Sequence, residues 1–84
     1  MEITALIQNE ADNIIISGSK DEIVKIYNFT HLDDPIELTE MKEPIICLEL
    51  NKILNRLFSG GKSGKICVWD INTHELISTI DTKI

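Results

Sequence analysis

One block of sequence occurs twice in this 84-residue chain, and its two copies lie 42 positions apart. Ser17–Asn28 (SGSKDEIVKIYN) returns without a gap as Ser59–Asp70 (SGGKSGKICVWD). The same offset matches residues upstream: Ile3 with Ile45, Leu6 with Leu48, Asn9 with Asn51 and Asn13 with Asn55. A fixed period of this length is typical of repeat proteins, in which each repeat is one supersecondary unit that packs on its neighbours. The sequence therefore predicts two copies of one structural unit.

Each unit contains four short segments that are rich in β-branched and other apolar residues and are separated by turn residues. The predicted strands are 3–7, 14–17, 23–27 and 36–38 in the first unit, and 45–50, 56–59, 65–70 and 76–80 in the second. The repeated asparagines mark turns, because asparagine tolerates a left-handed backbone. No window sustains a helical stripe of apolar residues. The chain is therefore predicted to be all-β, with two four-stranded antiparallel sheets.

The longest turn of the first unit leads to its weakest strand. A loop through His31, Asp33, Asp34 and Pro35 precedes residues 36–38. Proline lacks the amide that a strand ladder needs, so the strand is predicted to begin only after it.

The inner strands of both units are almost continuously apolar. Ile14–Ile16 and Ile66–Trp69 lack the alternation of apolar and polar residues that a sheet with one solvated face shows. This pattern predicts sheets that are covered on both faces, as in a stack of repeats.

Each block ends in an aromatic residue followed by Asn or Asp, Tyr27-Asn28 and Trp69-Asp70. With the Ser-Gly pair that opens each block and the 42-residue period, these features resemble the WD-repeat β-propeller family. The resemblance covers almost the whole chain and implies two blades, residues 1–42 and 43–84.

The resemblance also assigns structural roles to individual side chains. The assigned blade residues are Ser17, Asp21, Tyr27, Ser59, Trp69 and Asp70. Blades of this family often share a hydrogen-bonded tetrad of Asp, His, Ser or Thr, and Trp. Tyr27 stands where the first unit needs Trp. In the second unit Ser63 stands where Asp is needed and Met41 where His is needed, so neither unit completes the tetrad. Tyr27 and Trp69 are expected to be buried in the blades, and Asp70 to form turn hydrogen bonds.

Partners of such propellers usually dock on the face formed by the connections between the second and third strands and between successive blades. Lys20 and Lys62 recur in register on that face. One hypothesis is that they contact an acidic or phosphorylated segment of another protein. The alternative interpretation is two solvated turn lysines, since isolated surface charges contribute little energy.

Composition excludes several classes of partner. The net charge is −6 and no basic cluster is present, so nucleic-acid binding is not expected. The chain shows no secretory leader and no apolar run of the roughly 18 residues that a membrane span needs. An intracellular location is therefore predicted, in the cytoplasm or the nucleus, without membrane binding.

Motifs that carry chemistry are missing from the sequence. Cys47 and Cys67 lack the CxxC spacing of a zinc site and are interpreted as small strand side chains. Gly60–Gly64 resembles a phosphate loop but lacks its spacing and precedes a predicted strand. His31 and His74 each follow a Thr in a turn, and two imidazoles without a third ligand make a poor metal site. We expect no cofactor, no metal and no enzymatic activity.

The predicted function is that of a WD-repeat scaffold module that mediates protein–protein interaction. Two blades cannot close a ring, because propellers use about four to eight. The chain is expected to be a fragment of a larger ring; three or four copies that close one, or a partial product of marginal stability, are the alternatives. Two further functions stay open: a self-assembling two-blade propeller that binds a ligand at blade junctions, and a regulatory repeat segment of a larger enzyme-containing protein.

Overall fold

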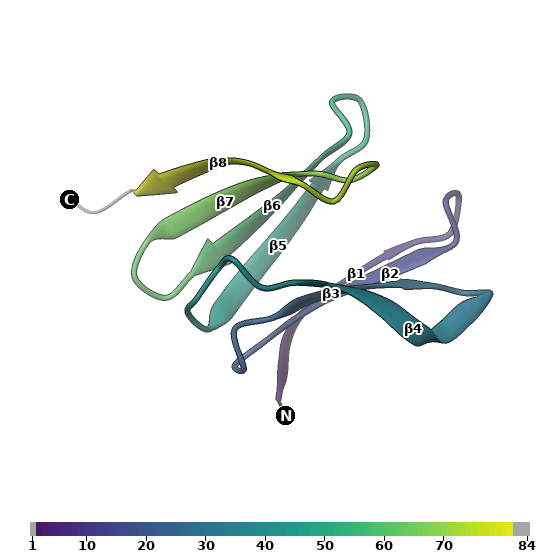
Figure 1. The fold of residues 1–84 in the computed structure, drawn as a ribbon, viewed down its shortest axis with the longest axis horizontal. Coiled ribbons are helices and arrows are strands. Elements are labelled where there is room, and N and C mark those ends of the chain that lie inside the picture. Colours follow the sequence, from purple (N-terminus) through teal and green to yellow (C-terminus); the bar gives the residue numbers. More distant parts are fainter. Residues whose placement is uncertain (1, 82–84) are drawn as a thin grey trace.

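The chain folds into two four-stranded antiparallel sheets that lie side by side (Figure 1). The computed structural model describes residues 2–81, apart from the side chains of residues 31–33. The first sheet contains β1 (Ile3–Asn9), β2 (Ile14–Ser19), β3 (Val24–Asn28) and β4 (His31–Leu38). The second contains β5 (Ile45–Asn51), β6 (Arg56–Gly61), β7 (Lys65–Asp70) and β8 (Leu76–Asp81). Strands are adjacent in sequence order, which confirms the predicted all-β class.

The tight turns repeat between the sheets with the same backbone geometry. Asn13 has a φ of 57° and Asn55 a φ of 55°, which confirms the left-handed turns predicted from the repeated asparagines. The turn between the second and third strands of each sheet also holds a positive φ, at Glu22 (75°) and at Gly64 (97°). The 42-residue period is therefore a period of backbone conformation as well as of sequence.

The start of β4 differs from the prediction. Residues 31–35 were expected to form a loop, yet the strand begins at His31, which pairs with Asn28. The next pair is Ile26 with Ile36, so the register shifts within the strand. Pro35 lies in the shifted stretch and lacks an amide hydrogen, so it interrupts the ladder of hydrogen bonds there. It does not prevent residues 31–34 from belonging to the strand.

The core lies between the two sheets. Strand β5 packs against β1 and β2 of the first sheet. The buried apolar residues come from both sheets and from the connection between them: Ile16, Val24, Ile26, Leu38, Met41, Ile45, Leu57, Cys67 and Trp69. A Cβ on Gly18 would lie 2.4 Å from Cγ2 of Ile45, so glycine at this position permits the close approach of β2 and β5.

Within the described chain each sheet is covered on the face that meets the other sheet, and its second face is more exposed; the prediction of two covered faces concerned a blade with a neighbour on each side. Leu6 is 64% exposed and Cys47 is also exposed. Tyr27 was expected to be buried but is half-buried, whereas Trp69 at the equivalent position is 0% exposed. The reason is positional: Trp69 faces the first sheet, and Tyr27 alternates with the inward Val24 and Ile26 on a face that no second sheet of this chain covers.

No helix in the described part of the chain is long and apolar enough to cross a bilayer.

Candidate functional site

The two lysines predicted from the repeat hold equivalent positions in the two sheets. The backbone amide of Lys20 donates to the carbonyl oxygen of Glu2 at 3.1 Å. The amide of Lys62 donates to the carbonyl oxygen of Pro44 at 3.3 Å, and Glu2 and Pro44 are themselves 42 positions apart. Each lysine is thus fixed through its backbone to the segment that enters the first strand of its own sheet.

Both lysines line one cavity of about 450 Å³ at the junction of the sheets, which we call the lysine groove. Its lining residues are Thr4, Lys20, Pro44, Ile45, Ile46 and Lys62. The Thr4 hydroxyl contacts the carbonyl oxygens of Gly18, at 3.3 Å, and of Ile45, and so links the two sheets below the groove. The structure therefore brings together two residues that lie 42 positions apart in sequence.

The groove combines positive charge with exposed apolar surface. Lys20 pairs with Glu2 at 3.2 Å, but the two side chains are 62% and 65% exposed, so solvent screens this ion pair. Ile46 is 55% exposed. Ammonium groups beside an apolar floor suit a segment that carries carboxylate or phosphate groups next to an aliphatic side chain.

The second sheet keeps part of the tetrad and replaces its histidine with a thioether. The indole Nε1 of Trp69 donates to Oγ of Ser59 at 2.9 Å, in a buried position. Oγ of Ser59 in turn donates to Sδ of Met41 at 3.4 Å, and Met41 is 0% exposed. Nζ of Lys65 donates to the Met41 carbonyl oxygen at 2.7 Å. Met41, which stands at the position where the family's tetrad has histidine, is therefore a member of the network.

A glutamate from the connection between the sheets supplies the carboxylate that position 63 lacks. Oε1 of Glu43 accepts from the Ser63 amide at 2.8 Å, and the Ser63 hydroxyl donates to the carboxylate at 2.7 Å. The hydrogen bonds from the Ser63 hydroxyl and then from its amide lower the pKa of Glu43 below its ordinary value of 4.5. Sequence reasoning missed Glu43 because it lies outside the repeated blocks, where no register points to it.

The first sheet has a different arrangement around its assigned residues. Ser17 is 5% exposed in β2. Oδ1 of Asp21 accepts from the Ser19 hydroxyl and from the amide of Ile23, the latter at 3.3 Å. Asp21 thus organises the turn between β2 and β3 through Ser19.

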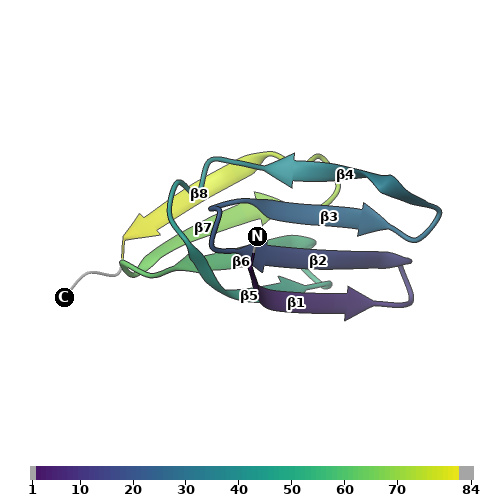
Figure 2. The same cartoon turned by 90° about the horizontal axis from the view of Figure 1, so that it is seen from below.

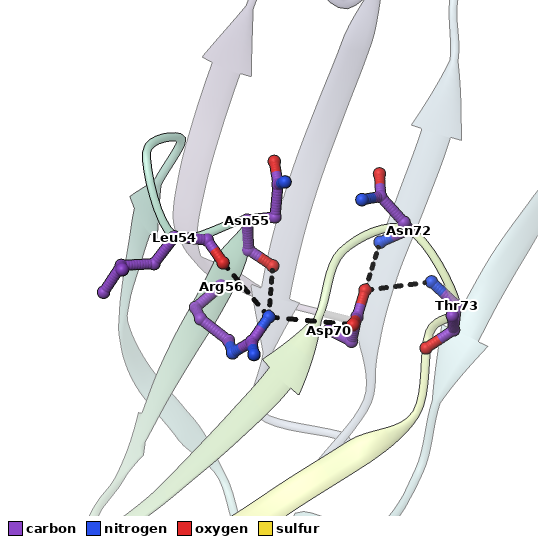
Figure 3. Close-up of polar contacts among 6 residues, drawn as sticks. All are labelled: Leu54, Asn55, Arg56, Asp70, Asn72 and Thr73. Carbon is purple, nitrogen blue, oxygen red and sulfur yellow. Dashed lines mark hydrogen bonds and ion pairs between the residues drawn. The ribbon is translucent and has the colours of Figure 1, made fainter.

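Asp70 ends β7 and organises the end of the second sheet opposite the turn that holds Ser63 (Figure 3). Its Oδ1 accepts from the amides of Thr73, at 3.1 Å, and Asn72, at 2.8 Å, and these bonds, the first most strongly, lower the pKa of Asp70 below its ordinary value of 3.8. Its Oδ2 lies 3.6 Å from Nη1 of Arg56, which also donates to the carbonyl oxygen of Leu54 at 3.0 Å. This carboxylate therefore holds two neighbouring turns in place, and Arg56 is a structural residue that the repeat did not reveal.

The histidines and cysteines do not form a site in the described structure. The side chain of His31 lies outside the described residues, and His74 is half-buried with a φ of 65°. Cys67 is buried in β7 and Cys47 is exposed in β5, and both are free thiols. Among the described side chains, no group of three or more His, Cys, Asp or Glu is arranged to hold a metal ion.

Comparison with known proteins identifies relatives of similar sequence. The chain is 33% identical over 72 residues to the p21-activated protein kinase-interacting protein 1-like of Danio rerio, covering 86% of this chain and 19% of that protein. It is 30% identical over 66 residues to the protein of the same name in Gallus gallus, covering 79% and 18%. The chain thus spans about a fifth of the length of these curated relatives. No family model matches the chain.

Comparison with solved structures concerns the fold. A chain of a crystal structure of the mitotic checkpoint complex superimposes with a TM-score of 0.83 and 21% sequence identity, covering 95% of this chain and 26% of that one. Taken with the two antiparallel sheets, this match supports the fold of two β-propeller blades.

Proposed function

We propose that the chain is a non-catalytic scaffold segment of a WD-repeat propeller, with two blades that dock a partner protein in the lysine groove. The observation that carries the proposal is the convergence of Lys20 and Lys62 on one cavity at the sheet junction. The relatives are named as proteins that interact with a p21-activated kinase, which supports a protein as the partner. The proposal keeps the intracellular location predicted from the sequence.

The groove favours an acidic or phosphorylated segment with an aliphatic residue between its charges. Lys20 and Lys62 supply the charge, and Ile46 and Pro44 the apolar surface. Lys20 already forms an exposed ion pair with the carboxylate of Glu2. A carboxylate of the partner replaces Glu2 in a similar contact, so little binding free energy is lost in breaking the existing pair.

The proposal is tested with a fluorescent peptide of sequence Glu-Glu-Leu-Glu-Glu. In a second peptide, phosphoserine replaces the two Glu residues that flank the Leu. Fluorescence anisotropy gives the affinity for the wild type, for the double variant K20A/K62A and for K52A. Lys52 is the matched control, because it is an exposed lysine of the turn between β5 and β6, at the other end of the sheet.

We expect K20A/K62A to weaken peptide binding about tenfold, with a reduced dependence on salt, and K52A to leave it unchanged. Equal binding by the wild type and K20A/K62A would contradict the proposal. A similar loss in K52A would show diffuse attraction by the whole surface rather than a site.

A second candidate function is a self-assembled ring that binds a ligand at blade junctions. The observation that favours it is the position of the groove, which takes its lining residues from both sheets. This candidate requires a discrete closed oligomer of the chain, which the solution mass tests.

A further inference from the structure

A second cavity lies at the end of the sheets opposite the lysine groove. It has a volume of about 350 Å³ and is lined by Ile14, Ile26, Asn28, Asp34, Ile36 and His74. Ile14 begins β2 and Asn28 ends β3, whereas Lys20 follows the other end of β2. Figure 2 shows β4 and the turn that leads into β8 on the same side of the molecule. We call this cavity the Asp34 pocket.

The pocket lies where the pairing of the third and fourth strands is irregular, and the register shift recurs in the second sheet between Val68–Ser78 and Trp69–Leu76. In the first sheet, the register shift between Asn28–His31 and Ile26–Ile36 includes Asp34. In the second sheet, the left-handed backbone of His74 brings its amide within 2.8 Å of the Asp70 carbonyl oxygen, and this closes the turn before β8.

The carboxylate of the pocket has no equivalent in the second unit. At the 42-residue offset Leu76 is the equivalent of Asp34, so the second unit has no matching carboxylate. The carboxylate at this irregular place is therefore a property of this chain's sequence and not of the fold alone.

The lining residues combine an aliphatic wall with a carboxylate at the rim. Ile14, Ile26 and Ile36 form the apolar side, and Ile36 is 39% exposed. Asp34 is exposed, and it forms no ion pair with any side chain that the structure describes. Oδ1 of Asn28 is already engaged by the Thr30 amide at 2.9 Å, which fixes this amide side chain at the rim.

These features fit a long aliphatic stem that ends in a planar cation. The chain carries a net charge of −6, which favours basic partners. A guanidinium group is preferred over an ammonium group, because its planar fork pairs with a carboxylate through two hydrogen bonds and stacks on flat rings such as the imidazole of His74.

We infer that the Asp34 pocket binds an arginine side chain presented by a partner protein. The methylene groups of the arginine pack on Ile14, Ile26 and Ile36, and the guanidinium pairs with the carboxylate of Asp34. This site is separate from the lysine groove, and its test does not depend on the proposed function.

The test titrates the full chain, labelled at its isoleucine methyl groups, with N-acetyl-arginine amide and follows the NMR signals. N-acetyl-citrulline amide, which has nearly the same shape without the charge, and N-acetyl-lysine amide are the comparison probes. We expect saturable shifts of the Ile14, Ile26 and Ile36 methyl signals with the arginine probe at a dissociation constant of about 1 mM. The lysine probe binds more weakly, and citrulline produces no saturable shift.

Two charge variants locate the contact. D34N is expected to weaken binding of the arginine probe about threefold to tenfold. E75Q, which removes an exposed carboxylate next to His74, is expected to leave it unchanged. Equal losses in D34N and E75Q, or equal shifts with arginine and citrulline, would overturn the inference. A thermal melt establishes that D34N is folded; if it is not, the comparison of arginine with citrulline on the wild type decides.

Discussion

At the scale of single residues, the structure shows how a chain that lacks a complete tetrad still satisfies its buried polar groups. Ser59 accepts from Trp69 and donates to Met41, and no buried side-chain nitrogen or oxygen in the described part of the chain lacks a partner. Glu43 supplies the carboxylate for the turn at Ser63. Met41 and Glu43 therefore supply hydrogen-bond acceptors in a network that has neither the histidine nor the Asp of the complete tetrad.

Replacement of Met41 by leucine tests the thioether. Leucine keeps the volume of the side chain but leaves the buried Ser59 hydroxyl without its acceptor, so we expect M41L to lower the free energy of unfolding by about 1–3 kcal/mol. The control is L57M, the reverse exchange at another fully buried position, where no polar partner is lost. Urea unfolding measures both, and an equal or smaller loss in M41L than in L57M would show that the sulfur contributes nothing.

Glu43 gives the molecule a specific dependence on acid. Its pKa is lowered in the folded state, so its stabilisation is fully present above the ordinary value of 4.5 and is lost as pH falls through the lowered folded value. We expect E43Q to reduce the melting temperature by about 2–4 °C at pH 7, with the difference from the wild type closing as pH falls below 4.5. Melts from pH 7 to pH 3 measure this, with E40Q as the control at an exposed carboxylate of the same connection. Parallel curves for E43Q and the wild type would contradict it.

At the scale of elements, the strands and tight turns were predictable, and the irregular segments were not. β-branched runs and repeated asparagines define both sheets because their preferences are local. The start of β4 depends instead on the pairing of His31 with Asn28, which no local preference specifies. The same holds for the site: the repeat pointed to Lys20 and Lys62, whereas Glu43 is engaged only because the fold places Ser63 beside it.

The turn between the second and third strands offers a matched pair of substitutions. Glu22 and Gly64 occupy equivalent positions with a φ of 75° and 97°, a region that a residue with a Cβ adopts at a cost. We expect E22G to raise the free energy of unfolding by about 0.5 kcal/mol, and G64A to lower it by about 1 kcal/mol. Urea unfolding of both variants measures this. A loss in E22G as large as that in G64A would show that backbone strain does not distinguish the two turns.

At the scale of the whole molecule, one face of each sheet has no neighbouring sheet in the described part of the chain. By the repeat register, the face of the first sheet that carries Leu6 and Tyr27 matches the face of the second sheet that carries Leu48 and Trp69. The outward face of the first sheet is thus equivalent to the inward face of the second sheet, and the reverse also holds. The two outward faces can therefore pack on each other as the two inward faces do within the chain. Copies that associate through them pack head to tail, which yields a ring only if the rotation closes.

We expect the mass of the chain, measured by light scattering after size exclusion, to rise with protein concentration through these faces. The variant L6K, on an outward face, should shift the mass toward a single chain. I53K should not, although Ile53 is 94% exposed, because Ile53 lies at the tip of a turn. The opposite ranking of the two variants would place association at the turn. A discrete trimer or tetramer with a cooperative melt would instead favour a self-closed ring.

The manner in which Lys20 and Lys62 are anchored has a consequence for which residues these positions accept. Main-chain amides hold both positions against Glu2 and Pro44, and the ion pair between the Lys20 and Glu2 side chains adds only a contact that solvent screens. Any residue except proline supplies the same amide. Substitution can therefore change the side chains that line the groove while these backbone hydrogen bonds are kept, so the identity of the residues at positions 20 and 62 is largely uncoupled from folding.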